Sequence, residues 1–372
     1  MELKKIGKSF LCNILESQVN KLKAKYNFKI VAVCGSVGKT STKLAIANLL
    51  QNNTKVLYQD GNYNDRLTVP LINFNRKLPN LFNIFAWILI YIKNEQTIRR
   101  GFPFDLVIVE LGTDAPGQIS KFKYLKPDIT VITAVAAEHM VNFDNLDEVA
   151  KEELRPLEFS NQALLNIEDI PVKYLPDTSY KSYGTNKDAD YRLELDKQDN
   201  LSGQFIKIDF PKNKRVELEI KLLGHQGAKA VVAAAAVADI LGWNIRDIKE
   251  GLSKLTSIPG RMQILSAINN SIIIDDTYNS SPIATKAALD VLYGAKYKNR
   301  IAILGSMNEL GPISQTEHEE IGKYCDPNKL NLVVTIGLEA KKYIAPVAKK
   351  NGCQVVSYLS PYEAGEYVKK LL

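Results

Sequence analysis

The stretch 31–42, V-A-V-C-G-S-V-G-K-T-S-T, constrains the fold of this chain more than any other segment. A β-branched run ends in Gly35, the triplet 38–40 (G-K-T) follows, and an apolar-periodic segment then begins. This order predicts a strand, a glycine turn and a helix start, where backbone N–H groups and the helix N-terminus surround a phosphate. We expect Lys39 to reach the β- and γ-phosphate oxygens and the Thr40 hydroxyl to bind Mg²⁺.

The loop departs from the common phosphate-loop pattern at one position. The pattern G-x-x-x-x-G-K-[ST] would place a glycine at position 33, where Val33 stands, so only G-x-x-G-K-T-S-T remains. The alternative interpretation is a glycine turn between two buried elements. The strand-like and helix-like patterns on its two sides favour phosphate binding.

The composition is that of an ordinary globular chain. At 372 residues, with 45% hydrophobic and 24% charged residues, the chain has the length for two or three domains. The net charge of +7 suits an anionic substrate such as a nucleotide, but equally a mildly basic surface. The four cysteines are far apart and show no C-x-x-C spacing, so we expect neither zinc nor a disulfide framework. We expect a cytoplasmic monomer without a signal peptide and without a nucleic-acid partner.

An apolar segment at 78–92, L-P-N-L-F-N-I-F-A-W-I-L-I-Y-I, is too short to span a bilayer as a helix. Basic residues bracket it, with Arg76 and Lys77 before it and Lys93 after it. The first interpretation is a helix that is buried or covers a cleft. The second is a peripheral membrane contact, with the helix lying in the plane of the membrane.

The pattern along the chain predicts an α/β protein of three parts. A basic amphipathic helix is expected in 1–28, because apolar residues recur there at helical spacing. A central domain, 29–257, alternates strands and helices around a mostly parallel sheet and carries a small antiparallel sheet at 190–222. A second, Rossmann-like α/β domain is expected in 258–372, with strand-like runs at 271–275, 300–304 and 332–336.

Two polar residues stand where buried strands of the central domain are expected to end. Glu110 follows the apolar run 106–109, and His139 lies beyond the strand expected at 129–134. Open α/β sheets bind ligands at the carboxyl ends of their strands, so a carboxylate beside a phosphate loop is a natural Mg²⁺ ligand. The alternatives are a solvated or salt-bridged strand-end glutamate and a structural histidine.

Seven short motifs then occur in a specific order. They are G-S-x-G-K-T-S-T at 35–42, G-N-Y-N at 61–64, E-L-G at 110–112, A-E-H at 137–139, P-G-R at 259–261, D-D-T-Y-N at 275–279 and G-S-M-N-E-L-G at 305–311. On these motifs, residues 29 to 345 resemble the Mur ligase family. The D-D-x-Y-N and G-x-M-x-E-L-G elements are most similar to its members that add D-alanyl-D-alanine to a UDP-muramoyl-tripeptide.

The resemblance implies an ATP-dependent ligase of peptidoglycan precursor synthesis. A substrate carboxylate attacks the ATP γ-phosphate, and an amine then displaces phosphate from the acyl phosphate. The site would be split between domains that close over the substrate and exclude water. The cofactors implied are ATP and Mg²⁺, and the partners are nucleotide and cell-wall precursor substrates.

The resemblance also assigns residues to roles. The implied catalytic residues are Lys39, Glu110, His139 and Glu153, and the implied ligands of two Mg²⁺ ions are Thr40, Glu110, His139 and Glu153. The implied ATP-binding residues are Gly35, Ser36, Gly38, Lys39, Thr40, Ser41, Lys229, Arg261 (on phosphate) and Asp276 (on ribose). The implied substrate-binding residues are Asn62, Asn64, Tyr278 and Asn279.

One departure from the family concerns a metal-bridging group. The family has a lysine, carbamylated by CO₂, shortly after the histidine, and matching V-A-K-E-E at 149–153 places Glu153 there. A glutamate already carries a carboxylate and would need no CO₂. Lys151 is the alternative, a register shift of one residue would change the assignment, and a solvated helix charge is the third interpretation.

Other departures bear on the substrate. Lys229 replaces an asparagine that contacts adenine in the family, and the family's UDP-gripping N-terminal domain and a C-terminal K-G-[ST] element have no counterpart in 1–372. We therefore expect the last domain to be shortened. These departures leave two alternatives open: a Mur-type ligase for a different carboxylate and amine, and a non-catalytic nucleotide-binding protein of cell-wall synthesis.

Overall fold

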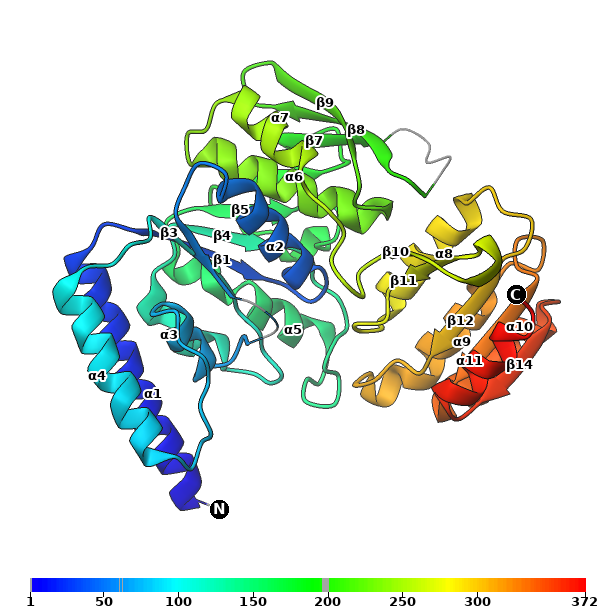
Figure 1. The fold of residues 1–372 in the computed structure, drawn as a ribbon, viewed down its shortest axis with the longest axis horizontal. Coiled ribbons are helices and arrows are strands. Elements are labelled where there is room, and N and C mark those ends of the chain that lie inside the picture. The colour runs from blue at the N-terminus through cyan, green and yellow to red at the C-terminus, as the bar shows by residue number, and fades with distance from the viewer. Residues whose placement is uncertain (1, 60, 62, 196–200) are drawn as a thin grey trace.

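A computed structural model describes residues 2–59, 61, 63–195 and 201–372, with side chains from Gly7 onward. Within this part of the chain, the centre is a nine-stranded sheet of order β2-β3-β1-β4-β5-β6-β7-β8-β9 (Figure 1). Its strands are β1 (Lys29–Cys34), β2 (Val56–Tyr58), β3 (Leu106–Glu110), β4 (Ile129–Ile132), β5 (Ala163–Asn166), β6 (Lys181–Gly184), β7 (Tyr191–Leu195), β8 (Gln204–Phe210) and β9 (Lys214–Ile220).

The sheet changes from parallel to antiparallel along its width. Neighbouring strands from β2 to β7 pair in parallel, whereas β8 pairs antiparallel with both β7 and β9. The antiparallel strands expected at 190–222 are confirmed, and they continue the parallel sheet. Along β9 buried residues alternate with exposed ones, the pattern of a sheet that faces water on one side.

Helices cover both faces of the parallel strands. On one face lie α2 (Lys39–Leu50), which packs on β1, and α6 (Gly224–Ile240) and α7 (Ile245–Ser253), which cover strands farther along the sheet; on the other face lie α3 (Thr68–Ile72) and α5 (Leu146–Glu153). Residues of β1 therefore contribute to a core on each side, which explains its continuous apolar run. This sandwich holds the carboxyl end of β1, and the loop that follows it, in a fixed position.

The C-terminal residues form a smaller α/β unit. Three parallel strands, β12 (Ile301–Gly305), β13 (Leu332–Ile336) and β14 (Val355–Tyr358), pack with helices. These helices are α8 (Pro282–Gly294), α9 (Ser314–Tyr324), α10 (Ala345–Lys350) and α11 (Pro361–Lys369). The α/β character expected for this region is confirmed.

One strand of that region pairs differently from the expected pattern. β11 (Ile272–Asp275) forms an antiparallel pair with β10 (Gln263–Ser266) and lies outside the three-stranded sheet. Only the short connection 267–271 separates the two strands, and antiparallel strands can be joined by a short turn, whereas parallel strands need a long crossover.

Two helices form an arm that projects from the central sheet (Figure 1). α1 (Glu2–Lys25) and α4 (Ile84–Arg100) lie side by side and run in the same direction, since Gln18 Nε2 donates to the Tyr91 carbonyl at 3.1 Å and the Tyr26 hydroxyl to the Ile98 carbonyl at 3.0 Å. The N-terminal helix is confirmed, and the apolar segment supplies the first half of α4 and the loop before it. No helix in the described ranges is long and apolar enough to cross a membrane.

Candidate active site

A cleft of about 460 Å³ lies between the carboxyl ends of the central strands and the C-terminal unit. The central part contributes the loop 36–40, Glu110, Glu138 and His139 to its lining. The C-terminal unit contributes Arg261 together with segments 278–281 and 308–310. A ligand in this cleft would therefore touch both units at once, at the edge of the sheet where open α/β proteins bind their ligands.

The glycine loop has the backbone that its sequence predicts. β1 ends at Cys34, Gly35 has a φ of 121° and Gly38 a φ of 87°, and α2 starts at Lys39. Both glycines occupy the left-handed region, which L side chains rarely adopt. A Cβ on Gly35 would also lie 2.5 Å from Thr133 Oγ1, so this position has no room for a side chain.

We predict that Gly35→Ala lowers the free energy of unfolding by about 2 kcal/mol or more, because it adds backbone strain and a clash in a packed site. The measurement is chemical denaturation. Gly117→Ala is the matched control, because Gly117 also has a positive φ (79°) but its added Cβ would meet nothing within 4 Å. Equal losses in the two variants would show that the packing around Gly35 contributes nothing.

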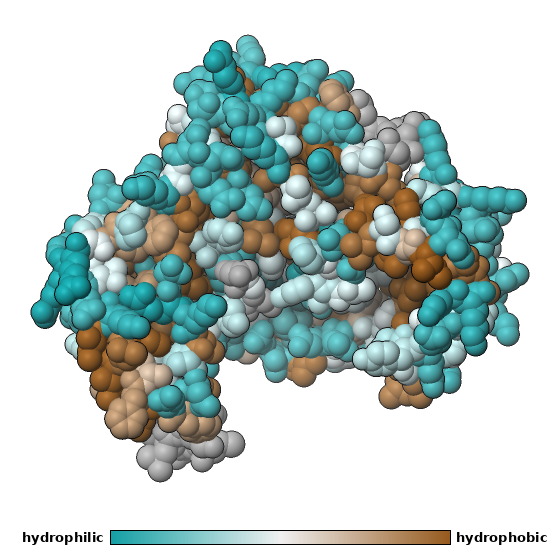
Figure 2. All heavy atoms as spheres, viewed as in Figure 1, coloured by the Kyte–Doolittle hydropathy of each residue, from teal (hydrophilic) through white to brown (hydrophobic). Residues whose placement is uncertain are grey.

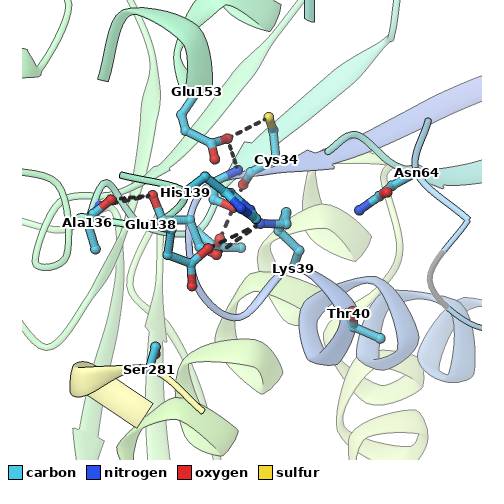
Figure 3. Close-up of polar contacts among 12 residues, drawn as sticks. Cys34, Lys39, Thr40, Asn64, Ala136, Glu138, His139, Glu153 and Ser281 are labelled. Carbon is cyan, nitrogen blue, oxygen red and sulfur yellow. Dashed lines mark hydrogen bonds and ion pairs between the residues drawn. The ribbon is translucent and has the colours of Figure 1, made fainter. Parts of the chain in front are cut away.

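Lys39 is held against its own loop. Its Nζ donates to the carbonyl oxygens of Gly35 (2.6 Å) and Ser36 (2.9 Å), and it lies 3.9 Å from Glu138 Oε2 (Figure 3). Burial opposes the ammonium charge, but the carboxylates of Glu153, Glu138 and Glu110 outweigh it and raise the pKa of Lys39. The cleft therefore carries a fixed positive charge at the mouth of the glycine loop.

The carboxylate of Glu110 is buried, and three side chains neutralise or solvate it. The Thr40 hydroxyl donates to its Oε2 at 3.0 Å, Lys43 Nζ lies 3.3 Å from the same oxygen, and Asn64 Nδ2 donates to Oε1 at 3.3 Å. Thr40 and Glu110 thus present two oxygen ligands side by side on the cleft wall. This donor set fits Mg²⁺, which takes one or two carboxylates and fills its other positions with water and substrate phosphates.

The four predicted metal ligands do not form one cluster. His139 has a left-handed backbone (φ 54°), and its Nδ1 lies 2.6 Å from Glu309 Oε2 in the C-terminal unit. No group of three or more histidine, cysteine, aspartate or glutamate side chains in the described ranges is placed to hold a metal ion. His139 contacts Glu309 and Glu153 accepts the Gly35 N–H, and the roles of Thr40, Glu110, His139 and Glu153 as ligands of two Mg²⁺ ions stay predictions.

Glu153 lies behind the glycine loop, at the end of α5. Its Oε2 accepts the Gly35 N–H at 2.8 Å and the Cys34 thiol at 3.0 Å, and the residue is 3% exposed (Figure 3). Burial and the Glu153 carboxylate raise the pKa of the Cys34 thiol. The interpretation of Glu153 as a solvated helix charge is wrong, and Lys151, the alternative, is exposed. Glu153 as a metal ligand stays a prediction.

Arg261 and the predicted substrate-binding residues reach the cleft. The Arg261 guanidinium lies over the Tyr278 ring at 4.3 Å, and Asn64, Tyr278 and Asn279 line the same space. Asn62 lies outside the described residues. The structure therefore brings one cation and three polar or aromatic side chains toward the glycine loop from distant parts of the sequence.

Other predicted nucleotide ligands have partners away from the cleft. Lys229 Nζ lies 2.9 Å from Asp169 Oδ1 and 3.4 Å from Glu168 Oε1, and it is nearly buried. Asp276 accepts the Met262 N–H at 3.1 Å, and burial raises its pKa. Neither residue, nor Ser41, is among the described residues that line the cleft. The predicted contacts of Lys229 with adenine and of Asp276 with ribose both stay predictions.

Sequence reasoning missed several residues that the structure places at or beside the cleft. Glu138 lines it, and burial raises the pKa of its carboxyl against the opposing charge of Lys39. Lys43 is fully buried and pairs with Glu110. The spacing contained a signal for Lys43, which follows Lys39 by one helical turn and so shares its face of α2. Ser281, Asn308 and Glu309 line the cleft from the C-terminal unit. Asn308 and Glu309 lie in the motif at 305–311, to which the resemblance assigns no site role, and no local pattern indicates Ser281.

A glycine phosphate loop at the edge of a parallel sheet, faced by a second α/β unit, defines a nucleotide-binding protein with a divided site. Two models of protein-family domains match the chain, and both describe domains of Mur ligases. A Mur ligase middle domain matches residues 93–238, and the Mur ligase, glutamate ligase domain matches residues 260–372. The chain belongs to the Mur ligase family.

Individual relatives point to one branch of that family. The chain is 28% identical over 355 residues to the UDP-N-acetylmuramoyl-tripeptide–D-alanyl-D-alanine ligase of Haemophilus influenzae, covering 91% of this chain and 71% of that protein. It is 31% identical over 308 residues to the ligase of the same name from Rickettsia prowazekii, covering 80% of this chain and 62% of that protein. The chain thus spans only part of these relatives.

Solved structures share the fold. MurF from Acinetobacter baumannii superimposes with a TM-score of 0.79 at 20% identity, over 98% of this chain and 74% of that one. MurF from Thermotoga maritima in complex with ADP gives a TM-score of 0.76 at 20% identity, covering 98% of this chain and 78% of that one. The predicted fold class is therefore confirmed.

Proposed function

We propose that this chain is an ATP-dependent amide ligase of peptidoglycan precursor synthesis that joins D-alanyl-D-alanine to the carboxylate of a UDP-muramoyl-tripeptide. The observation that carries the proposal is the cleft itself, in which the loop with Lys39 and Thr40 faces Arg261 and Tyr278 across one space. The names of the two relatives described above supply the substrate pair.

The reaction needs charge neutralisation and close positioning more than covalent chemistry by the protein. The substrate carboxylate oxygen attacks the γ-phosphorus of ATP, and the bond to the ADP oxygen breaks. The amine nitrogen of the dipeptide then attacks the acyl carbon, and phosphate leaves with the bonding electrons. Lys39 and the N–H groups at the start of α2 stabilise the negative charge that gathers on the transferring phosphoryl group.

Thr40 and Glu110 would hold Mg²⁺, which supplies further positive charge at the phosphate oxygens. From the C-terminal unit, Arg261 is placed to bind phosphate, and its stacking on Tyr278 limits its freedom before the ligand arrives. Closure of the two units would keep water away from the acyl phosphate. Because both walls of the cleft come from one chain, we propose that a monomer suffices, working in the cytoplasm where ATP is supplied.

His139 is the residue through which we propose to test the metal site. We predict that His139→Ala raises the Mg²⁺ concentration needed for half-maximal turnover, because its side chain lines the same cleft as the Thr40–Glu110 pair. The measurement is a Mg²⁺ titration of ADP release. Glu309→Gln is the control, since it weakens the contact with His139 (2.6 Å) and leaves the imidazole in place. The same shift in both variants would assign His139 to holding the two units together.

The function is tested by measuring ADP release with purified protein across a panel of UDP-muramoyl peptides and amines. Turnover with the tripeptide and D-alanyl-D-alanine, and loss of turnover when either is omitted, is the expected result. Turnover with a different pair would redirect the proposal to another Mur-type ligase reaction. ATP binding without ADP release for any pair would favour the non-catalytic alternative, with Lys39→Ala as the reference for background hydrolysis.

A further inference from the structure

The end of the α1–α4 arm exposes a large apolar surface, which we call the tip patch. Phe85 is 85% exposed, Phe82 76% and Ile84 69%, values typical of charged surface residues. The tip patch consists of Phe10 on α1 and Leu78, Leu81, Phe82, Ile84, Phe85, Ile88, Leu89, Tyr91 and Ile92 on α4 and the loop before it. Figure 2 shows brown, hydrophobic atoms gathered on this projecting end.

The residues of the tip patch are not those that pack α4 against the rest of the protein. One side of α4 is buried against the protein through Trp87, Ile90, Asn94 and Ile98. A different side, reached at helical spacing, carries the exposed Phe85, Ile88, Leu89 and Ile92. Packing of the arm therefore explains one apolar stripe and leaves the other in water. Contiguous exposed apolar surface of this kind marks an interaction site.

The apolar stripe is limited to the outer half of the arm. Beyond Ile92 the exposed positions of α4 become polar, with Lys93, Gln96, Arg99 and Arg100. Because the two helices run in the same direction, both N-termini lie at the tip end, with the positive ends of their dipoles. The arm thus has an apolar end and a polar base.

The charges along the segment 77–93, which carries most of the tip patch, have one sign. No aspartate or glutamate occurs between Lys77 and Lys93, and both of these lysines are exposed. This combination of apolar side chains with basic neighbours is complementary to a surface that is apolar inside and negatively charged outside.

We propose that the tip of the α1–α4 arm inserts shallowly into a bilayer that contains anionic lipid. Phe82, Phe85 and the aliphatic side chains would enter the boundary between headgroups and acyl chains, while Lys77 and Lys93 contact lipid phosphates. A second copy of the chain fits less well, because it would bring two tips of the same charge together. The arm lies on the opposite side of the central sheet from the C-terminal unit (Figure 1), so the contact leaves the cleft accessible. This proposal does not depend on the ligase reaction.

The first experiment is co-sedimentation of the full chain with vesicles of phosphatidylcholine alone or of phosphatidylcholine mixed with phosphatidylglycerol. We expect binding to the anionic vesicles that weakens with added salt. The double variant Phe82→Ser, Phe85→Ser should bind about tenfold or more weakly, because it lacks two aromatic side chains that would move from water into the bilayer on binding. Tyr362→Ser is the matched control, since Tyr362 is 85% exposed on α11, away from the arm.

The second experiment separates charge from apolar contact. Lys77→Glu with Lys93→Glu should weaken binding to anionic vesicles about tenfold or more, whereas Lys349→Glu with Lys350→Glu makes the same change in net charge on α10 and should have little effect. Circular dichroism checks folding, and Phe10→Ser tests the patch independently from α1.

Three results would overturn the proposal. The first is no binding to anionic vesicles. The second is equal binding by the tip and control variants. The third is a dimer, detected by light scattering, that the double phenylalanine variant abolishes while vesicle binding is absent.

Discussion

Replacing Lys39 by alanine is expected to reduce ATP turnover by a factor of about 10²–10³ or more, which is the usual effect of removing a charge that stabilises a transition state. Lys39 begins α2, lines the cleft and carries a pKa raised by its carboxylate neighbours, so it stays protonated across the neutral range. The measurement is steady-state ADP release with saturating Mg²⁺ and substrates.

The same substitution should leave the fold largely intact. The Nζ bonds of Lys39 go to carbonyl groups of its own loop, so their loss affects the loop more than the sheet beneath it. Lys55→Ala, at an exposed position beside β2, is the control for removal of a lysine from the same unit. Near-wild-type ADP release from Lys39→Ala, with a normal circular dichroism spectrum, would show that this loop does not bind the reacting phosphates.

Replacing Glu153 by glutamine is expected to reduce turnover strongly, because it removes a buried negative charge while keeping the size of the side chain. Among the carboxylates that raise the pKa of Lys39, Glu153 has the largest effect, and it also accepts the Gly35 N–H. Neutralising it would weaken the loop at two points: the charge that holds Lys39 protonated and the hydrogen bond that holds the end of β1. The measurement is ADP release together with thermal unfolding.

A second variant distinguishes the metal role of Glu153 from its role in the loop. Turnover of the wild type should not depend on bicarbonate, because a glutamate already carries a carboxyl group and needs no CO₂ to supply one. Glu153→Lys should regain part of its activity only with added bicarbonate, which allows a carbamate to form. If the wild-type protein needs bicarbonate, Lys151 becomes the candidate for the carbamylated lysine. Wild-type activity in Glu153→Gln would show that turnover does not need the carboxylate of Glu153.

The sequence by itself determined the elements whose cause is local. The strand, glycine turn and helix at 29–50 follow from β-branched residues, from two glycines with positive φ, and from apolar residues at helical spacing. The alternation in 204–220 predicted antiparallel strands for the same reason, since side chains of a strand point to opposite faces at a period of two. Each of these patterns is complete within a few neighbouring residues.

Tertiary structure alone decided which distant side chains meet. Glu153 reaches the N–H of Gly35 across 118 positions of sequence, and Lys229 pairs with Asp169 across 60, and neither partner is encoded by periodicity or spacing. The pairing of β11 with β10, and the stripe of α4 that stays exposed while another is buried, depend in the same way on packing between elements. A helix pattern shows that a residue is apolar, but only the neighbouring element determines whether that residue is covered.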